Sequence, residues 1–385
     1  MSNTFLMALV ELEEPAIFSC RHEAGNLSRT HNYIPGSIIL GALANYFIYE
    51  KNGSADEDDF KGFFLSEDVK FGNLYPAFKE EKAFYHTIPI PLSTFTCKHY
   101  PGINKKNFRG EQHSFADFLI SEMANECQTC HAPLKNREGY YFYKKPFLYY
   151  VETRKIIKMH NVIDDKTQKP EENAVFSFEA IAEEEYFTGI IIFSNEDIKS
   201  NFVNKIFGGE KEIELSIGKG KSRGYGKCKL KIIAERQGEY ISSFLIKRDF
   251  DTRWEDWQKK GQNTFSLTLY SDAIITDKYL RHLTVISEEW FKEELGIDVN
   301  LIKYFSKPIF IDGFSGVYGL PLEQEIGISK GSTFLYRFNS NKSEEIKDKL
   351  ENLEKEGIGF RKNEGFGWLI VCDDYHVNWG DKWEK

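Results

Sequence analysis

Two stretches of the chain share one order of apolar and polar positions. Apolar residues recur at helical spacing in Glu196 to Phe207 and again in Ser343 to Glu356. Each stretch is followed by a glycine-rich run, Gly218 to Gly226 in the first case and Gly357 to Gly367 in the second. An apolar, strand-like segment comes after each run. The repeated order predicts a duplicated domain with a loop in each copy whose glycines leave the backbone exposed.

Further elements are expected around these loops. Thr4 to Ser19 is typical of one long strand, and Ile38 to Phe47 of a buried helix with Ser37 as its N-cap. Val175 to Ala182 and Tyr186 to Phe193 are expected to pair as a hairpin. Each half then fits the order β-α-β-β-α-β, the ferredoxin-like arrangement. The predicted fold class is α+β, with two such domains in tandem.

Length and composition agree with two domains in a globular protein. The chain has 385 residues, with 41% hydrophobic and 28% charged residues. The charged stretch 239–260 is the expected boundary, which gives domains at residues 1–240 and 260–385, the first with an insertion at about 97–137. No signal peptide is recognisable, and no apolar segment reaches the roughly 18 to 20 residues of a membrane-spanning helix. We therefore expect the protein in the cytoplasm.

The charge is acidic overall and basic in one place. A net charge of −9 argues against a generic basic nucleic-acid binder. The segment 216–234 nevertheless lacks Asp and Glu and carries the cations Lys219, Lys221, Arg223, Lys227, Lys229 and Lys231. Glycine amides and interleaved cations suit phosphate groups, although the run lacks the P-loop pattern. The alternative is a tight turn with solvated lysines.

With the segment Ile34-Pro-Gly-Ser37, the two glycine-rich runs resemble the RAMP superfamily of CRISPR–Cas proteins. The second run is most similar to that of the tandem-domain RAMP subunit of type III-D effectors. The resemblance implies ferredoxin-like domains and binding of CRISPR RNA. It also implies a role in capping the five-prime handle of the guide RNA. The implied protein partners are the large signalling subunit and the backbone RAMP subunits.

This resemblance and the charge pattern together nominate RNA-binding residues. The two domains are expected to form a cleft whose walls carry the two glycine-rich loops. From the loops we expect contacts by Lys219, Lys221, Arg223, Tyr225, Arg361, Lys362 and Phe366. Near the N-terminus, Arg21, Arg29, His31 and Ser37 are expected to contact RNA or a neighbouring subunit.

Three of the six cysteines lie in the insertion and predict a structural zinc site. They are Cys97 and the pair Cys127 and Cys130, which have the spacing Cys-x2-Cys. The fourth ligand comes from His99, His113 or His131. His113 is preferred because it precedes residues 115–123, which we expect to be helical. Four protein ligands leave no open position for water, so a structural role is expected rather than a catalytic one.

Two other functions remain open. His22 and His31, with Arg21, Arg29 and Tyr33, resemble the set of groups that a metal-independent endoribonuclease needs: a general base, a general acid and a cation. Such an enzyme would process CRISPR repeat RNA. The second possibility is a scaffold that binds only proteins. The favoured interpretation is a non-catalytic RNA-binding and assembly subunit of a type III effector complex.

Overall fold

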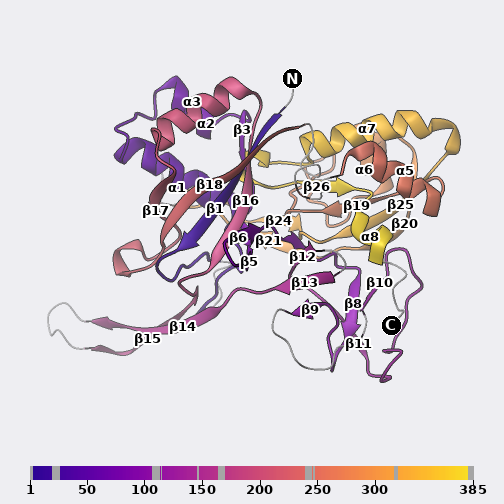
Figure 1. Cartoon of the computed structure of the whole chain (residues 1–385), viewed down its shortest axis with the longest axis horizontal. Helices are drawn as coiled ribbons and strands as arrows, with labels where there is room; N and C mark the ends of the chain where they lie inside the picture. Colours follow the sequence, from indigo (N-terminus) through magenta and orange to yellow (C-terminus); the bar gives the residue numbers. More distant parts are fainter. Residues whose placement is uncertain are drawn as a thin grey trace.

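The computed structural model describes residues 3–19, 27–105, 113, 115–144, 147–163, 170–238, 245, 248–315 and 320–379. Helices and largely antiparallel sheets are both present, so the predicted α+β class is confirmed (Figure 1). Among these residues, no helix has the length and apolar character needed to cross a membrane.

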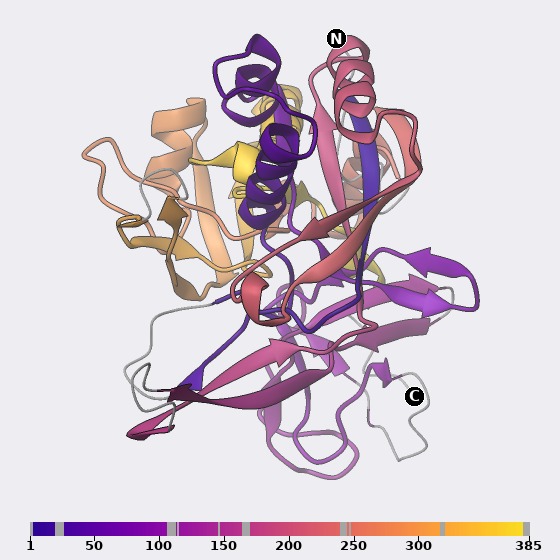
Figure 2. The same cartoon turned by 90° about the vertical axis from the view of Figure 1, so that its left-hand side faces the viewer.

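A five-strand path with one side branch forms the sheet of the first half. Its strands are β1 (Asn3–Leu12), β3 (Val69–Phe71), β4 (Tyr75–Pro76), β16 (Tyr186–Phe193), β17 (Glu212–Ser216) and β18 (Lys227–Gly238). They are ordered β17-β18-β1-β16-β3, and β4 also pairs with β16. The helices of this half are α1 (Gly36–Tyr49), α2 (Asp58–Phe64) and α3 (Glu196–Phe207), which lie together beside the sheet (Figure 2).

Alternate side chains of strand β1 belong to two different hydrophobic clusters. Leu6, Ala8 and Val10 belong to the core that contains the buried side chains of α1, α2 and α3. Phe5 and Met7, which alternate with them, belong to a different cluster. Because successive side chains of a strand point to opposite faces, the sheet is buried on both sides.

The second half has its own sheet and core. Its strands β19 (Thr264–Leu269), β20 (Val299–Phe305), β25 (Thr333–Phe338) and β26 (Leu369–Val371) are ordered β20-β25-β19-β26. Its helices are α5 (Phe250–Lys260), α6 (Glu288–Leu295), α7 (Ser343–Glu356) and α8 (Asp374–Trp379). Two small ribbons pair β21 (Pro308–Ile311) with β24 (Glu325–Ile328) and β22 (Phe314–Ser315) with β23 (Leu320–Pro321).

Both sheets follow the connectivity β-α-β-β-α-β. In the first half the path runs β1, α1, β3, β16, α3, β18, and in the second it runs β19, α6, β20, β25, α7, β26. In each sheet the first strand lies between the third and the fourth, and all these pairs are antiparallel. The first half differs by the extra strand β17, which comes between α3 and the first glycine-rich loop.

The long segment between β3 and β16 forms small sheets. Its strands are β5 (Phe78–Glu80), β6 (Ala83–Tyr85), β7 (Ile88–Pro89), β8 (Thr94–Cys97), β9 (Asn104–Lys105), β10 (Phe115–Asp117), β11 (Leu134–Asn136), β12 (Tyr140–Lys144), β13 (Phe147–Val151), β14 (Lys155–Ile163) and β15 (Pro170–Ile181). Strands β14 and β15 pair with each other, and β15 also pairs with β2 (Leu27–Ser28). Together β14 and β15 form an arm that extends away from the body (Figures 1 and 2).

The two halves share a buried aromatic cluster. Trp368, which precedes β26, stacks on Tyr270, with 6.3 Å between ring centroids. Tyr75 of β4 donates a hydrogen bond to the Tyr270 carbonyl at 2.6 Å. Phe5 and Met7 of β1 lie in the same cluster. The halves are therefore joined by a hydrophobic interface and not only by the chain between them.

Several local predictions are wrong. The first strand ends at Leu12, because the amides of Glu13 and Glu14 turn to the Lys227 carbonyl. The predicted hairpin of residues 175–182 and 186–193 does not form: β15 pairs with β14, and β16 enters the main sheet. Alternation shows that both segments are strands but cannot show which strands pair.

The start of α1 and the segment near the cysteines also differ from expectation. Helix α1 begins at Gly36 with Pro35 at its N-cap position, so Ser37 lies in the first turn and does not cap it. Residues 115–123 contain the strand β10 and a turn rather than a helix. The predicted boundary 239–260 includes α5, whose Trp254 and Trp257 are buried in the core of the second half.

Candidate nucleic-acid interface and metal centre

The first glycine-rich loop presents three cations to solvent. It carries a short 3-10 turn, η1 (Lys221–Arg223), between glycines with positive φ, 76° at Gly220 and 75° at Gly224. The Lys219 amide donates to the Ile17 carbonyl at 3.0 Å, and the Gly226 amide donates to Pro15 at 2.9 Å. These bonds hold the loop against the segment after β1. The side chains of Lys219, Lys221 and Arg223 are exposed, and none pairs with an acidic group among the described residues.

The other three cations of this basic segment are paired with carboxylates. Lys229 Nζ lies 2.7 Å from Glu13, Lys231 Nζ lies 2.8 Å from Glu212, and Lys227 Nζ lies 3.2 Å from Glu13. Glu13 directly follows β1 and Glu212 lies on β17, so both acidic partners are outside the segment that contains the lysines. The basic surface is therefore concentrated at the tip of the loop.

Tyr225 is part of the core beneath the loop. Its side chain is buried, and its hydroxyl lies 2.7 Å from His160 Nε2 of β14. The expected stacking of this ring on an RNA base does not fit that burial, because no ring face is open to solvent. Tyr225 instead packs against residues of the arm, a contact that no local pattern in the sequence indicates. Lys158 of the arm is exposed, and its Nζ lies 5.3 Å from the Tyr225 ring centroid. This lysine therefore lies next to the first glycine-rich loop.

The second glycine-rich loop faces the first half of the same chain. Its 3-10 turn η3 (Lys362–Glu364) packs on β3 and α1. A Cβ atom on Gly365 would lie 2.6 Å from the Phe71 carbonyl oxygen, so the backbones touch there. Arg361 pairs with Glu325 at 2.8 Å and with Glu364 at 2.7 Å, and Lys362 Nζ lies 3.9 Å from Glu67. The charges of this loop are thus largely compensated within the protein.

The N-terminal candidates lie near the junction of the halves. Arg21 and His22 are outside the described residues, and Arg29 is exposed. His31 contacts Tyr33, whose hydroxyl donates to Asp272 Oδ2 at 2.9 Å, and Lys330 Nζ lies 3.9 Å from the Tyr33 ring centroid. Burial, and after it the charge of Lys330, lowers the pKa of His31 to about 4. At neutral pH the imidazole is uncharged and has no acidic proton to give to a leaving group.

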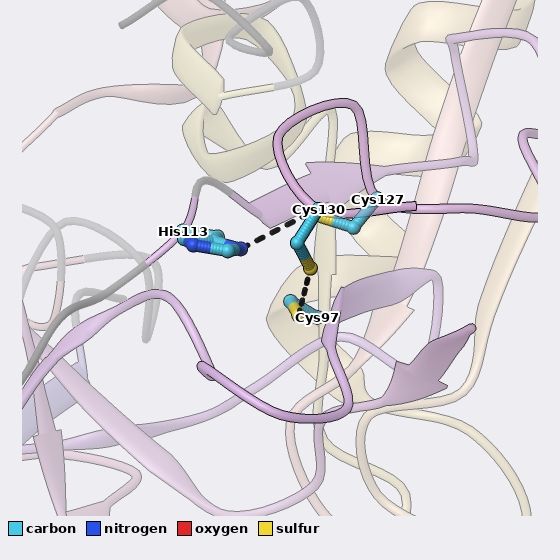
Figure 3. A group of neighbouring side chains, drawn as sticks. All are labelled: Cys97, His113, Cys127 and Cys130. Carbon is cyan, nitrogen blue, oxygen red and sulfur yellow. Dashed lines mark hydrogen bonds between the residues drawn. The ribbon is translucent and has the colours of Figure 1, made fainter. Parts of the chain in front are cut away.

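Four side chains of the insertion converge on one point (Figure 3). Ligand atoms of Cys97, His113, Cys127 and Cys130 all lie within 4.8 Å of one another. Cys97 Sγ is 3.5 Å from Cys130 Sγ, and Cys127 Sγ is 3.3 Å from His113 Nδ1. Strand β8 supplies Cys97, whereas the other three come from the loops before β10 and before β11. Of the three histidines weighed from the sequence, His113 is the one that joins the cysteines.

The surroundings of the cysteines favour an ionised ligand. Burial opposes a charge on Cys127. Hydrogen bonds from the Cys130 and Thr129 amides and from His113 outweigh that effect and lower the pKa of the Cys127 thiol to about 6. A thiolate is the form that binds metal ions. The cluster therefore has the donor set of a metal site, and Cys127 is a cysteine of it whose pKa is lowered.

Comparison with known families agrees with this architecture. A model of the RAMP superfamily matches residues 22–229, more than half of the chain. The chain belongs to the RAMP superfamily. The matched region of this RAMP protein contains α1, the four-residue Cys and His cluster, the arm and the first glycine-rich loop.

The proteins of known structure that resemble this chain have little sequence identity with it. No curated protein matches the sequence. One structural neighbour is a chain from the cryo-EM structure of the type III-B Cmr-beta bound to cognate target RNA. Its TM-score is 0.46 at 14% identity, over 94% of this chain and 96% of that chain. A chain from the same system with target RNA and AMPPnP, in state 1, has a TM-score of 0.43 at 14% identity, over 90% and 93%.

Proposed function

We propose that this RAMP protein is a non-catalytic CRISPR RNA-binding and assembly subunit of a type III effector complex. In this proposal it holds the five-prime handle of the guide RNA and contacts the large signalling subunit and the backbone RAMP subunits. Because the second glycine-rich run resembles that of a type III-D subunit, we propose type III-D as the class of complex. The two β-α-β-β-α-β sheets are interpreted as tandem ferredoxin-like domains, and the complex as cytoplasmic.

One observation carries the RNA-binding part of the proposal. Within a chain of net charge −9, the tip of the first loop has three exposed cations and no acidic partner among the described residues. Unpaired lysine and arginine side chains on a glycine-rich backbone are the groups that contact phosphates and ribose. The compensated second loop has a different role in this proposal, which is to hold the two halves together.

The metal site has a structural role in the same proposal, and the ion is zinc. A tetrahedral site with Zn–S bonds of about 2.3 Å places its sulfurs about 3.8 Å apart. The separations in the cluster, 3.5 Å between two sulfurs and 3.3 Å from sulfur to nitrogen, are close to that geometry. Three cysteines and one histidine complete the four positions, which leaves none for a catalytic water.

RNA binding by the purified chain tests the proposal. The triple variant Lys219→Ala, Lys221→Ala and Arg223→Ala should weaken binding of repeat-derived single-stranded RNA. The slope of log K against log salt should fall by about 2, since each phosphate contact contributes about 0.7. Unchanged affinity and slope would favour a scaffold that binds only proteins. Cleavage of repeat RNA without metal, lost in His31→Ala, would instead favour an endoribonuclease.

A further inference from the structure

A second basic site lies beside the metal cluster, in a cavity of about 330 Å³. Strands β8 and β11, which pair with each other, form part of its wall. The cationic side chains of its lining are Lys98, Lys135 and Arg137. A cavity of this size is in the range of small-molecule sites, and a phosphate group with its ribose fits the volume.

The three cations have no acidic partner in the described part of the chain. None of them forms an ion pair there, and Lys98 and Lys135 are exposed. Glu138, the acidic residue in the lining, is bound to Lys307 at 2.8 and 3.0 Å. A divalent ion held by three thiolates and a histidine would have a net charge of −1, so the cations of the cavity are these three side chains alone.

The position of the Arg137 side chain suits the binding of an anion. Its guanidinium carbon lies 3.8 Å from the Tyr150 ring centroid, an arrangement that restricts the side chain before any ligand binds. Its Nε atom is buried and has no hydrogen-bond partner. Leaving a buried donor unpaired is unfavourable, so an acceptor that reaches this atom is favoured. Phosphate oxygens accept from a guanidinium in the bidentate geometry that arginine offers.

A second cavity continues the surface and favours a strand over a single nucleotide. Its volume is about 220 Å³, and its lining includes Tyr150, Asn32, Glu152 and Lys155. Lys155 forms an ion pair with Glu179 at 2.9 Å, so this cavity adds length to the surface rather than free positive charge. Because Arg137 stacks on Tyr150, the two cavities meet at this pair. Asn32 is adjacent in sequence to His31, so the surface leads from the metal-bearing insertion toward the junction of the two halves.

We infer that the metal-bearing insertion has its own phosphate-binding site, formed by Lys98, Lys135 and Arg137, which binds the backbone of single-stranded RNA. This inference rests on the proposed function for the identity of the ligand. It adds a second anchor for the RNA on a different part of the fold. The metal cluster then has a defined task, because Cys97 positions β8 and with it Lys98 at the edge of the cavity.

The test measures binding of a fluorescent single-stranded RNA to the full-length, metal-loaded protein over a range of salt concentrations. The double variant Lys98→Gln and Lys135→Gln should weaken binding about tenfold. It should lower the salt slope by about 1.4, the value for two lost phosphate contacts. Arg137→Lys keeps the charge but loses the Nε donor and the bidentate geometry of the guanidinium. It should therefore weaken RNA binding while the salt slope is preserved. Metal content should stay unchanged in all of these variants.

The matched control is Lys82→Gln with Lys211→Gln, two exposed lysines elsewhere with the same change in net charge. If it weakens RNA binding as much as the cavity variant, the effect is general electrostatics and the inference fails. If only the Lys219, Lys221 and Arg223 variant loses RNA, the proposed function stands and the insertion site is overturned. If the wild-type protein binds no RNA, the proposed function itself fails.

Titration of the same proteins with ATP, inorganic phosphate and polyglutamate separates the sources of the anion. ATP binding that is lost in the double variant while RNA affinity is unchanged would assign the site to free nucleotides and overturn the RNA inference. Polyglutamate binding lost in the same way would assign it to an acidic protein. RNA binding that falls in the double variant, with weak binding of all three competitors, supports the inference.

Discussion

At the scale of single residues, a buried ion pair connects the insertion that carries the Cys and His cluster to the second half of the chain. His376 of α8 and Asp117 of β10 are both fully buried, with His376 Nδ1 2.5 Å from Asp117 Oδ2. His376 Nε2 lies 2.9 Å from Thr268 Oγ1 of β19. Burial disfavours both charges, but each partner outweighs it. The pKa of Asp117 is lowered and that of His376 is raised.

This pair predicts a stability that depends on pH. The His376 contribution is full below its ordinary pKa of 6.5 and is lost as pH rises through its raised folded pKa. The Asp117 contribution is full above 3.8 and is lost as pH falls through its lowered folded pKa. Asp117→Asn should therefore cost about 3–5 kcal/mol between these values, measured by urea unfolding, and less at alkaline pH.

The control for that experiment is Asp298→Asn. Asp298 pairs with Lys292 at 3.2 Å on the surface, so the change should cost under about 1 kcal/mol. A cost of Asp117→Asn that is the same at every pH would show that the His376 charge does not contribute.

The cysteine and histidine cluster predicts one bound zinc per chain. Cys127→Ser should lose the metal, because the remaining three ligands no longer close a tetrahedral site. Cys228→Ser is the matched control: Cys228 is a buried cysteine of β18 outside the cluster, so the metal content should be unchanged. Metal analysis of the purified proteins measures both. Well under one zinc in the wild-type protein would contradict the assignment.

At the scale of elements, the second glycine-rich loop predicts a packing role for its glycines. Gly365 has a φ of 91°, and an added Cβ would lie 2.6 Å from the Phe71 carbonyl oxygen. Gly365→Ala should therefore destabilise the protein by about 2 kcal/mol or more, through both backbone strain and the displaced contact. Thermal or urea unfolding measures the loss.

Gly41→Ala in α1 is the control for the loop variant. An added Cβ there has no neighbour within 4 Å, so the helix should gain about 0.5–1 kcal/mol. Equal effects of the two substitutions would mean that the contact between the loop and β3 is not maintained in solution.

At the scale of the whole molecule, the aromatic cluster between the halves predicts that they unfold together. Trp368 is 3% exposed, and the Gly72 backbone leaves the space that its ring occupies. Trp368→Ala should cost about 3–5 kcal/mol and separate the unfolding of the two halves into two transitions in calorimetry.

Trp290→Ala removes a tryptophan from inside the second core and leaves the interface intact. This variant should be destabilised while the coupling between halves is retained. Two transitions in the wild-type protein would contradict the prediction that the interface couples them.

Part of this architecture is predictable from local patterns, whereas the pairing of strands is not. The helical spacing of 196–207 and 343–356 correctly located α3 and α7, because periodicity reflects the face that a helix buries. The same kind of pattern could not reveal that 175–182 pairs with β14, since alternation looks alike for any partner strand. The Cys and His cluster was predictable from residue type and spacing, although His113 lies in a loop before a strand and not before a helix.

The sequence by itself determined the amphipathic helices α3 and α7, the family and the chemistry of the candidate groups, because these depend on neighbouring residues and on residue type. Only the tertiary structure decided which charges remain free and which rings remain exposed. Glu13 and Glu212 compensate three of the six cations near the first loop, and Tyr225 is buried beneath it. Such outcomes depend on residues that are distant in sequence and adjacent only after folding.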